Sequence, residues 1–266
     1  MRLITSAIWA LAVTVNAAKV SLNETSHPVL QSPDDGLPVN FGIVLYPAFQ
    51  ALDAFGPLDA LNLLSLTRKL NLSIIAQTMD PVTTQVRFPN INRFNSTFGQ
   101  AIMPTHTFDN APPLDVLLIP GGFGLRSPDL GPLLAYIKHA YPRLKYIITV
   151  CTGSELLART GILDGRQATT NKQAYNRAIK SGPKVKWVPE ARWVADGNVW
   201  TASGVSAGID LMFAFIDAVY GTVVSNQVSE EIEYVRNVDW RNDPFAHMVT
   251  DKPKDGPFVF DEDLVK

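Results

Sequence analysis

Short apolar runs rich in β-branched residues alternate with turn residues and with segments of helical spacing along most of this chain. The strand-like runs lie at residues 41–46, 72–76, 115–119 and 146–150. Strands separated by helices pair as a parallel sheet whose two faces are covered by those helices. The sequence therefore predicts an α/β fold with a mostly parallel central sheet, whose site lies beyond the carboxyl ends of the strands.

Composition divides the chain into four parts. Residues 1–17 have a basic start, an apolar run and small residues at the end, which is typical of a secretory signal peptide. The apolar run is short for a membrane span, although an uncleaved anchor is the alternative. Residues 18–39 are polar and contain prolines, residues 40–236 read as one domain, and residues 237–266 read as a polar tail. We expect a secreted protein with no membrane segment once the signal is removed.

Three Asn-X-Ser/Thr triplets, at Asn23, Asn71 and Asn95, agree with secretion, and together with the signal they predict an extracellular glycoprotein. The chain has one cysteine, so it cannot form an internal disulfide. Its 23 basic and 25 acidic residues nearly cancel, which gives no electrostatic reason to expect nucleic acid as a partner. Cysteine pairs of metal-ligand spacing are absent, and we expect no metal.

That single cysteine, Cys151, stands where the apolar run 146–150 gives way to small and polar residues and then to a helical pattern. The order predicts a sharp strand-to-helix turn with the thiol at its tip. Backbone N–H groups and the helix dipole at such a position favour thiolate over thiol. Cys151 is therefore a candidate nucleophile; the alternative is a buried, inert cysteine that acts as a small hydrophobe.

Two further strand ends are expected at the same edge of the sheet. Gly121 and Gly122 follow the run 115–119, and their N–H groups, with that of Thr152, are candidates for an anion pocket; the alternative is a plain tight turn. Asp53 follows the first strand and either exchanges protons with the thiol or caps a helix. Burial and a nearby negative charge would raise its pKa. The Thr152 hydroxyl is a candidate to bind substrate, to cap the next helix, or both.

Histidine is the expected base for a cysteine nucleophile, but none of the four histidines follows a strand end near Cys151. They are His27, His106, His139 and His247, of which only His106, in a loop, is a candidate to approach the site. A Cys-His-carboxylate triad is therefore poorly supported. This weakens a protease or amidase interpretation.

Taken in order, these motifs resemble the ThiJ/PfpI superfamily, which belongs to the class I glutamine amidotransferase-like proteins. The resemblance covers residues 41–234 and looks most like the isonitrile hydratase branch. It rests on the following segments: Leu45-Tyr46-Pro47, Leu52-Asp53 with Gly56-Pro57, Leu118-Ile119-Pro120-Gly121-Gly122, Val150-Cys151-Thr152-Gly153-Ser154, residues 161–170, residues 204–210 and Glu233-Tyr234.

The resemblance implies a flavodoxin-like three-layer sandwich with a nucleophile elbow. It also implies roles: Cys151 as nucleophile, Asp53 as acid/base group and Thr152 as a further functional residue. Relatives are typically homodimers without a metal or organic cofactor. By this resemblance the sulfur attacks the terminal carbon of an isonitrile, a small neutral electrophile, and water releases an N-substituted formamide.

One position departs from the family pattern. After Ala168-Thr169-Thr170 many relatives carry a histidine, whereas this chain has Asn171. Glyoxalase-like and peptidase-like relatives rely on a histidine close to the cysteine, so its absence argues against those activities. Two alternatives to isonitrile hydration stay open: a glyoxalase-like enzyme for reactive carbonyls, and a non-enzymatic redox-sensing or binding protein whose thiol oxidises without turnover.

Overall fold

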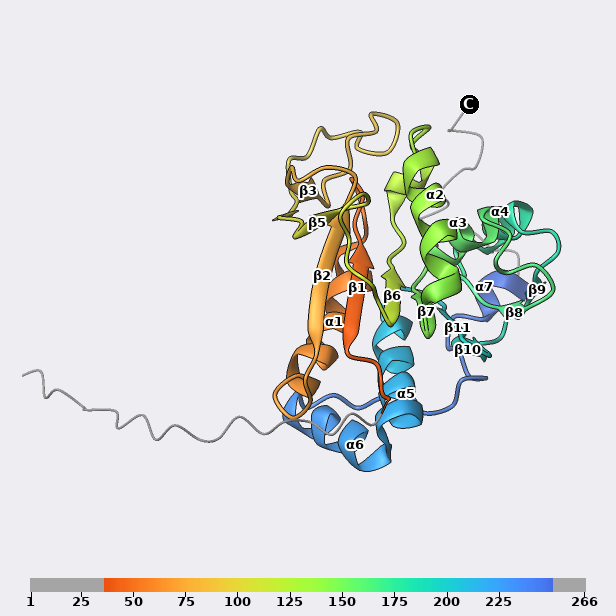
Figure 1. Ribbon diagram of the computed structural model, residues 1–266. Coiled ribbons are helices and arrows are strands. Elements are labelled where there is room, and N and C mark those ends of the chain that lie inside the picture. Colours follow the sequence, from red (N-terminus) through yellow and green to blue (C-terminus); the bar gives the residue numbers. More distant parts are fainter. Residues whose placement is uncertain (1–35, 251–266) are drawn as a thin grey trace, which may run out of the picture. The chain divides into compact units, whose positions relative to one another are not determined.

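The computed structural model describes residues 36–250, whose centre is a seven-stranded sheet (Figure 1). The strand order is β10-β11-β7-β6-β1-β2-β5, and all neighbours pair in parallel except β10 and β11, which are antiparallel. The strands span Asn40–Val44 (β1), Asn71–Ala76 (β2), His106–Thr107 (β5), Val116–Ile119 (β6), Tyr146–Thr149 (β7), Trp193–Asp196 (β10) and Val199–Ala202 (β11). The predicted mostly parallel α/β sheet is confirmed.

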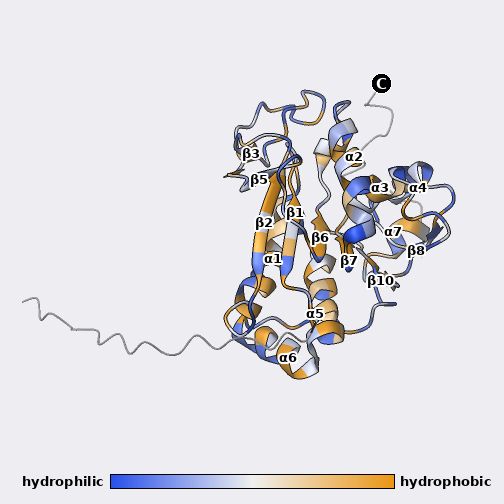
Figure 2. Cartoon of the chain, viewed as in Figure 1, coloured by the Kyte–Doolittle hydropathy of each residue, from blue (hydrophilic) through white to orange (hydrophobic). Residues whose placement is uncertain are grey.

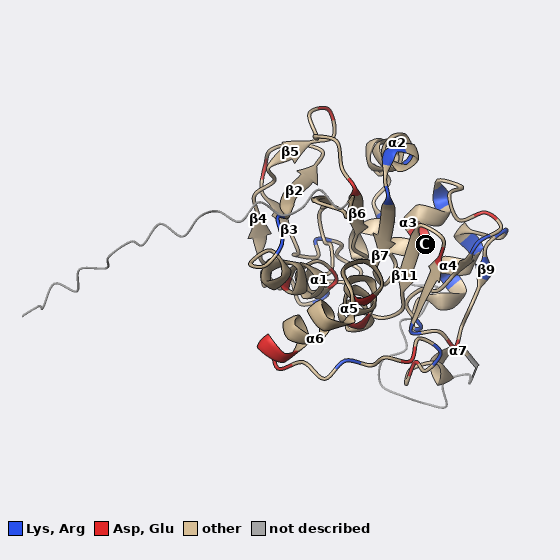
Figure 3. Ribbon diagram, turned by 60° about the horizontal axis from the view of Figure 1, so that its bottom comes forward, with Lys and Arg blue, Asp and Glu red and all other residues tan. Residues whose placement is uncertain are grey.

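Helices cover both faces of the sheet, as Figure 3 shows. On one side lie α1 (Ala51–Leu64), α5 (Ala207–Tyr220) and α6 (Thr222–Glu231), which pack against one another. The other side carries α2 (Gly131–Ala140), α3 (Gly153–Arg159) and α4 (Tyr175–Ser181). Within residues 36–250 no helix combines the length and apolar character needed to cross a bilayer.

The core lies between these layers, and the inner strands are apolar on both faces. All four residues of β6 are buried, as are three of the four in β7, so neither strand shows alternation. Figure 2 shows β2 and β6 mostly in the colours of hydrophobic residues. Continuous Val, Leu and Ile runs are what a strand covered by helices on both sides requires.

The order of the strands reverses at β1, which has β2 on one side and β6 on the other. In doubly wound sheets the crevice at such a reversal is where ligands bind, beyond the carboxyl ends of the strands. Asp53 follows β1, Gly121 follows β6 and Cys151 follows β7. The topology thus brings the three predicted strand ends to one edge.

Several short elements were not predicted individually. Residues 80–112, expected to hold a hairpin or excursion, contain β3 (Val82–Thr83) paired with β4 (Ala101–Ile102), and then β5. The helix α4 and the strand β8 (Gln167–Ala168) carry too few residues for a periodic pattern; β8 pairs in parallel with β9 (Lys186–Trp187). A short 3-10 helix, η1 (Phe123–Arg126), follows the glycine pair.

Some predictions fall on residues outside the described part of the chain. These are the signal peptide at 1–17, nearly all of the loose segment at 18–39, the triplet at Asn23, and residues 251–266 of the tail. The first part of the predicted tail is described: it includes α7 (His247–Thr250), and its Asp243 is buried against the domain.

Candidate active site

Cys151 sits at a strained turn between β7 and α3. Its backbone φ is +58°, in the left-handed region that costs a residue with a Cβ roughly 1–2 kcal/mol. Backbone bonds hold the turn: the Cys151 N–H donates to the Ala202 carbonyl (3.2 Å), and Gly153 N–H donates to the Val150 carbonyl (2.9 Å). The predicted sharp strand-to-helix turn is confirmed.

Two glycines let the backbone of β6 approach this turn closely. A Cβ on Gly153 would lie 2.3 Å from the Ile119 carbonyl oxygen. A Cβ on Gly121 would lie 2.6 Å from both the backbone nitrogen and the hydroxyl oxygen of Thr152, and 3.0 Å from Asp53 Oδ2. The site therefore leaves no room for a methyl group at either position.

Asp53 is the third residue of α1 and does not cap it, because the N-cap position is Gln50 and no side chain makes a capping bond there. The helix-cap alternative is therefore wrong. Instead Asp53 Oδ2 accepts a hydrogen bond from the Gly121 N–H (2.9 Å). Its other oxygen, Oδ1, is buried and has no hydrogen-bond partner among the described residues.

Burial dominates the charge state of the Asp53 carboxyl. It raises the pKa from 3.8 to about 7, although the Gly121 N–H and the Cys151 side chain both favour the charged form. The upward direction agrees with the sequence prediction. A carboxyl with such a pKa is half protonated at neutral pH, so it can both accept and return a proton.

Burial also raises the pKa of the Cys151 thiol, and the negative charge of Asp53 raises it further. The N–H and hydroxyl of Thr152 and the side chain of Asn171 lower it by less. The expectation of a resting thiolate is therefore wrong: the thiol is buried, and desolvation outweighs its amide donors. At rest the sulfur carries its proton beside a carboxyl that can take it.

The glycine N–H groups hold side chains of the site. Gly121 N–H is engaged by Asp53, and Gly122 N–H donates to the Thr152 hydroxyl oxygen (3.1 Å). Thr152 occupies the N-cap position of α3 without making a side-chain capping bond, so its hydroxyl is available to the sulfur. That these amides stabilise developing negative charge on a substrate stays a prediction.

Asn171 is the site residue that the sequence prediction left out. Its Oδ1 accepts a hydrogen bond from the Ala174 N–H (3.0 Å), which directs the amide nitrogen the other way, and its side chain hydrogen-bonds to the sulfur of Cys151. The neighbouring Thr170 hydroxyl donates to the Cys151 carbonyl (3.2 Å). The available signal was position 171, where the sequence departs from the pattern of the superfamily that it resembles.

A buried carboxylate one turn beyond the nucleophile was also missed. Glu155 is ion-paired to Arg159 and to Arg177, the latter at 2.6 Å, and Arg159 also donates to the Leu125 carbonyl (3.3 Å) in η1. These bonds join α3 to α4 and to the loop that follows the glycine pair. Glu155 is thus part of the frame of the site, with both oxygens occupied.

The described histidines lie elsewhere. His106 is in β5, the edge strand four places from β7 in the sheet, which at a strand spacing of about 4.8 Å is roughly 19 Å away. His139 is on α2 and His247 on α7. Within residues 36–250 no group of three or more His, Cys, Asp or Glu residues could hold a metal ion.

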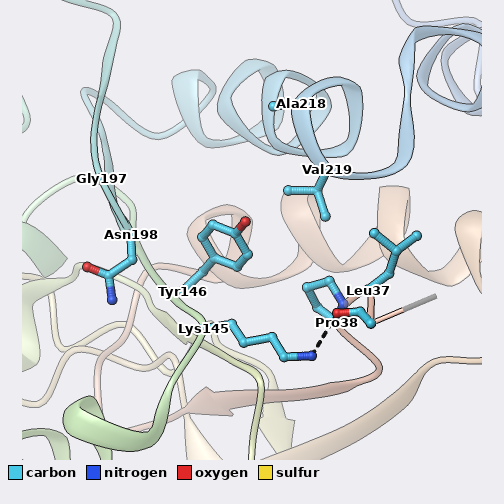
Figure 4. A pocket seen from close by; sticks show the side chains of 9 residues that line it. Leu37, Pro38, Lys145, Tyr146, Gly197, Asn198, Ala218 and Val219 are labelled. Carbon is cyan, nitrogen blue, oxygen red and sulfur yellow. Dashed lines mark hydrogen bonds between the residues drawn. The ribbon is translucent and has the colours of Figure 1, made fainter. Parts of the chain in front are cut away.

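An open pocket of about 570 Å³ lies at the other end of the sheet (Figure 4). Lys145 and Tyr146 line it at the start of β7, together with Leu37, Pro38 and Val219. Cys151 follows the opposite end of the same strand. The pocket is therefore separate from the cysteine site.

Comparisons with known proteins agree with this geometry. The DJ-1/PfpI family pattern matches residues 42–218. A crystal structure of a THiJ/PfpI family protein from Pseudomonas syringae superposes with a TM-score of 0.64 at 28% identity, covering 82% of this chain and 85% of the other. The flavodoxin-like fold predicted from the resemblance is confirmed.

Three relatives of similar sequence carry names that point to three different activities. Isonitrile hydratase of Pseudomonas putida is 32% identical over 203 residues, 74% of this chain and 78% of the relative. The HTH-type transcriptional regulator GbdR of Pseudomonas aeruginosa is 30% identical over 160 residues, 59% of this chain and 43% of the regulator. Deglycase PH1704 of Pyrococcus horikoshii is 31% identical over 117 residues, 42% of this chain and 66% of the deglycase.

Proposed function

Because this chain belongs to the DJ-1/PfpI family, we propose that it is a cysteine-dependent enzyme that hydrates isonitriles to N-substituted formamides. The observation that carries the proposal is the buried pair of Cys151 and Asp53, a protonated thiol beside a carboxyl whose pKa is about 7. The pair can deliver a nucleophile and a proton to the same small region. The likeness to an isonitrile hydratase supports the choice of substrate.

Isonitrile chemistry uses both members of the pair at one atom. The terminal carbon of R–N≡C accepts a nucleophile and then a proton, so that S–H adds across a single carbon. Asp53 takes the thiol proton as sulfur attacks and returns it to that carbon, which gives the thioimidate R–N=CH–S–Cys151. The unpartnered Oδ1 of Asp53 is the oxygen free to carry the proton.

Water then completes the turnover. Asp53, ionised again, removes a proton from water as the oxygen attacks the thioimidate carbon, and passes that proton to the nitrogen. The tetrahedral intermediate R–NH–CH(OH)–S–Cys151 collapses to R–NH–CHO and expels the sulfur, which takes up the proton of the hydroxyl group through Asp53. Thr152 and Asn171 hydrogen-bond to the sulfur and stabilise the thiolate as it leaves.

Incubation with cyclohexyl isonitrile in ¹⁸O-labelled water tests the proposal. We expect one ¹⁸O atom in the formamide and a Cys151 adduct equal in mass to the isonitrile during turnover. Cys151→Ala should abolish both signals, whereas Met103→Ala, an exposed change in the 80–112 excursion, should leave them unchanged. Absence of both formamide and adduct from the wild-type protein would overturn the proposal.

The GbdR likeness favours the non-enzymatic alternative, and the deglycase likeness favours reactive carbonyls as substrates. Two further assays separate these alternatives from isonitrile hydration. Oxidation of Cys151 by peroxide without turnover of any electrophile would indicate a sensor or binding protein. Production of lactate from methylglyoxal would indicate a glyoxalase-like enzyme.

We also propose that the protein is secreted after cleavage near residue 17 and acts as a homodimer. The basic and apolar start of the chain supports the first part, and the family resemblance supports the second. Sequencing of the mature N-terminus from expressing cells and light scattering of the purified protein test the two parts separately. A retained Met1 or a monomeric mass would overturn the respective part.

A further inference from the structure

The segment 237–250 lies beyond the residues matched by the family pattern, yet it is bonded to the domain next to the cysteine site. The Arg192 N–H donates to the Trp240 carbonyl (2.7 Å), and the Asp243 N–H donates to the Glu190 carbonyl (3.2 Å). These bonds place Asp243 inside the protein, where its side chain is only 1% exposed.

The Asp243 carboxylate joins two loops. Its Oδ2 accepts a hydrogen bond from the Ser203 hydroxyl (2.5 Å) and lies 3.5 Å from the Lys172 ammonium. Its Oδ1 lies 3.7 Å from Arg192 Nη1 and accepts a hydrogen bond from the Phe245 N–H (3.1 Å). Ser203 belongs to the loop after β11, whereas Lys172 belongs to the loop after β8.

In both cases the residue just before the one bound to Asp243 contacts the nucleophile. Lys172 follows Asn171, whose side chain hydrogen-bonds to the sulfur. Ser203 follows Ala202, whose carbonyl accepts the Cys151 N–H (3.2 Å). One carboxylate therefore fixes the spacing between a donor to the sulfur and the backbone that carries the sulfur.

Lys172 depends on Asp243 for its charge balance. The lysine is buried and donates to the Thr169 hydroxyl (2.8 Å) and the Ala191 carbonyl (2.6 Å). Burial lowers its pKa to about 8, Asp243 and Glu190 oppose that effect, and Arg192 adds to it. Arg192 already has a carboxylate of its own, Asp210, at 2.6 Å. Loss of Asp243 thus leaves Lys172 with only the smaller electrostatic effect of Glu190 to offset its burial.

We propose that Asp243 is a positioning residue of the cysteine site, which holds the Asn171–Lys172 loop and Ser203 so that the Asn171 amide is directed at the sulfur. Asp243 does not touch the reacting atoms and acts only through Asn171. The inference rests on Cys151 being the reactive group of the proposed function, but not on the identity of the substrate. It gives the segment after residue 236 a part in the chemistry.

Alkylation kinetics of the single cysteine test this proposal without any substrate. Iodoacetamide labelling of the folded protein, followed by mass spectrometry from pH 6 to 10, reports on the thiolate directly. We expect Asn171→Ala to slow labelling about tenfold at fixed pH, because a donor to the thiolate is lost. Asp243→Asn should slow labelling severalfold. Both variants should move the pH profile of labelling to higher pH.

The double variant is decisive, because the effects of two substitutions do not add when one residue acts through the other. In the Asn171→Ala background, Asp243→Asn should have no further effect on labelling. Asp239→Asn, an exposed change on the same segment, is the matched control and should label like the wild type. Multiplying effects in the double variant, or wild-type labelling of Asp243→Asn, would overturn the proposal.

Ser203→Ala provides a second route if Asp243→Asn fails to fold. It removes the 2.5 Å hydrogen bond and leaves the charges in place, and it should slow labelling in the wild-type but not the Asn171→Ala background. A protein that shows this coupling but hydrates no isonitrile would leave the positioning role intact and remove only the proposed function.

Discussion

Replacement of Asp53 by asparagine should stabilise the protein at neutral pH while it removes the proposed acid/base group. The carboxyl is 1% exposed, and its pKa rises from 3.8 to about 7 on folding. Each pKa unit corresponds to 1.36 kcal/mol, so about three units amount to roughly 4 kcal/mol of free energy lost to keeping this group buried above pH 7. Asparagine is neutral and can still accept the Gly121 N–H bond.

The pH dependence follows from the direction of this pKa change. Between about pH 4 and 7 the folded protein binds a proton at Asp53 that the unfolded chain has released, so the stability of the wild type falls as pH rises through this window. The Asp53→Asn variant has no carboxyl to titrate at this position, so its stability does not fall in this window. The two proteins should be nearly equal in stability at pH 4, and the variant should gain up to about 4 kcal/mol by pH 7.5 and then stay level.

Urea unfolding monitored by tryptophan fluorescence at pH 4, 6 and 8 measures the difference. Asp59→Asn is the matched control, because this residue is exposed on the same helix and should change stability by less than about 0.5 kcal/mol. An Asp53→Asn protein that is less stable than the wild type at pH 8 would refute the reasoning, since it would mean that the carboxylate is a net stabilising group.

Three further outcomes are expected. Gly121→Ala should reduce kcat/KM for an isonitrile at least tenfold with the fold retained by circular dichroism, because the new Cβ would meet Thr152 at 2.6 Å; unchanged kinetics would contradict the close approach. Alkylation of Cys151 should keep accelerating above pH 8.5, because its pKa is raised, and a plateau near pH 7 would show a thiolate instead. If the chain is secreted, Asn95→Gln should remove a glycan visible by mass spectrometry, because Asn95 is in an exposed loop. Asn71→Gln should change the glycan mass less, because the Asn71 amide is hydrogen-bonded to Asn40 (2.8 Å). A larger loss of glycan from Asn71→Gln than from Asn95→Gln would contradict this difference.

The strands of the central sheet could be predicted because each carries its own local signal. The run Val116–Ile119 is continuously apolar, the run Tyr146–Thr149 is rich in β-branched residues, and turn residues follow both. The turn at Cys151 was predictable for the same reason, since small residues follow directly. Parallel pairing then brings Asp53, Gly121 and Cys151 to one edge without knowledge of any long-range contact.

The electrostatics of the site could not be read in the same way. Whether the helix N-terminus or desolvation decides the pKa of Cys151 depends on how deeply the sulfur lies and on where Asp53 is. Both depend on contacts between residues far apart in the sequence, such as the bond from Gly121 to Asp53. Asn171 and Asp243 come from loops without periodicity. Their bonds to the site join residues far apart in the sequence, and local patterns carry no information on such bonds.

The raised pKa of Cys151 also bears on how this sulfur survives between reactions. Peroxides and disulfides react with thiolates, so an enclosed, protonated thiol is sheltered from them, whereas the same thiol in the newly made, unfolded chain is not. Folding thus protects the single cysteine of the chain from oxidation. The thiol is most exposed to oxidants between synthesis and completion of the fold, so a reductant should improve the yield of active protein most during refolding and least during storage.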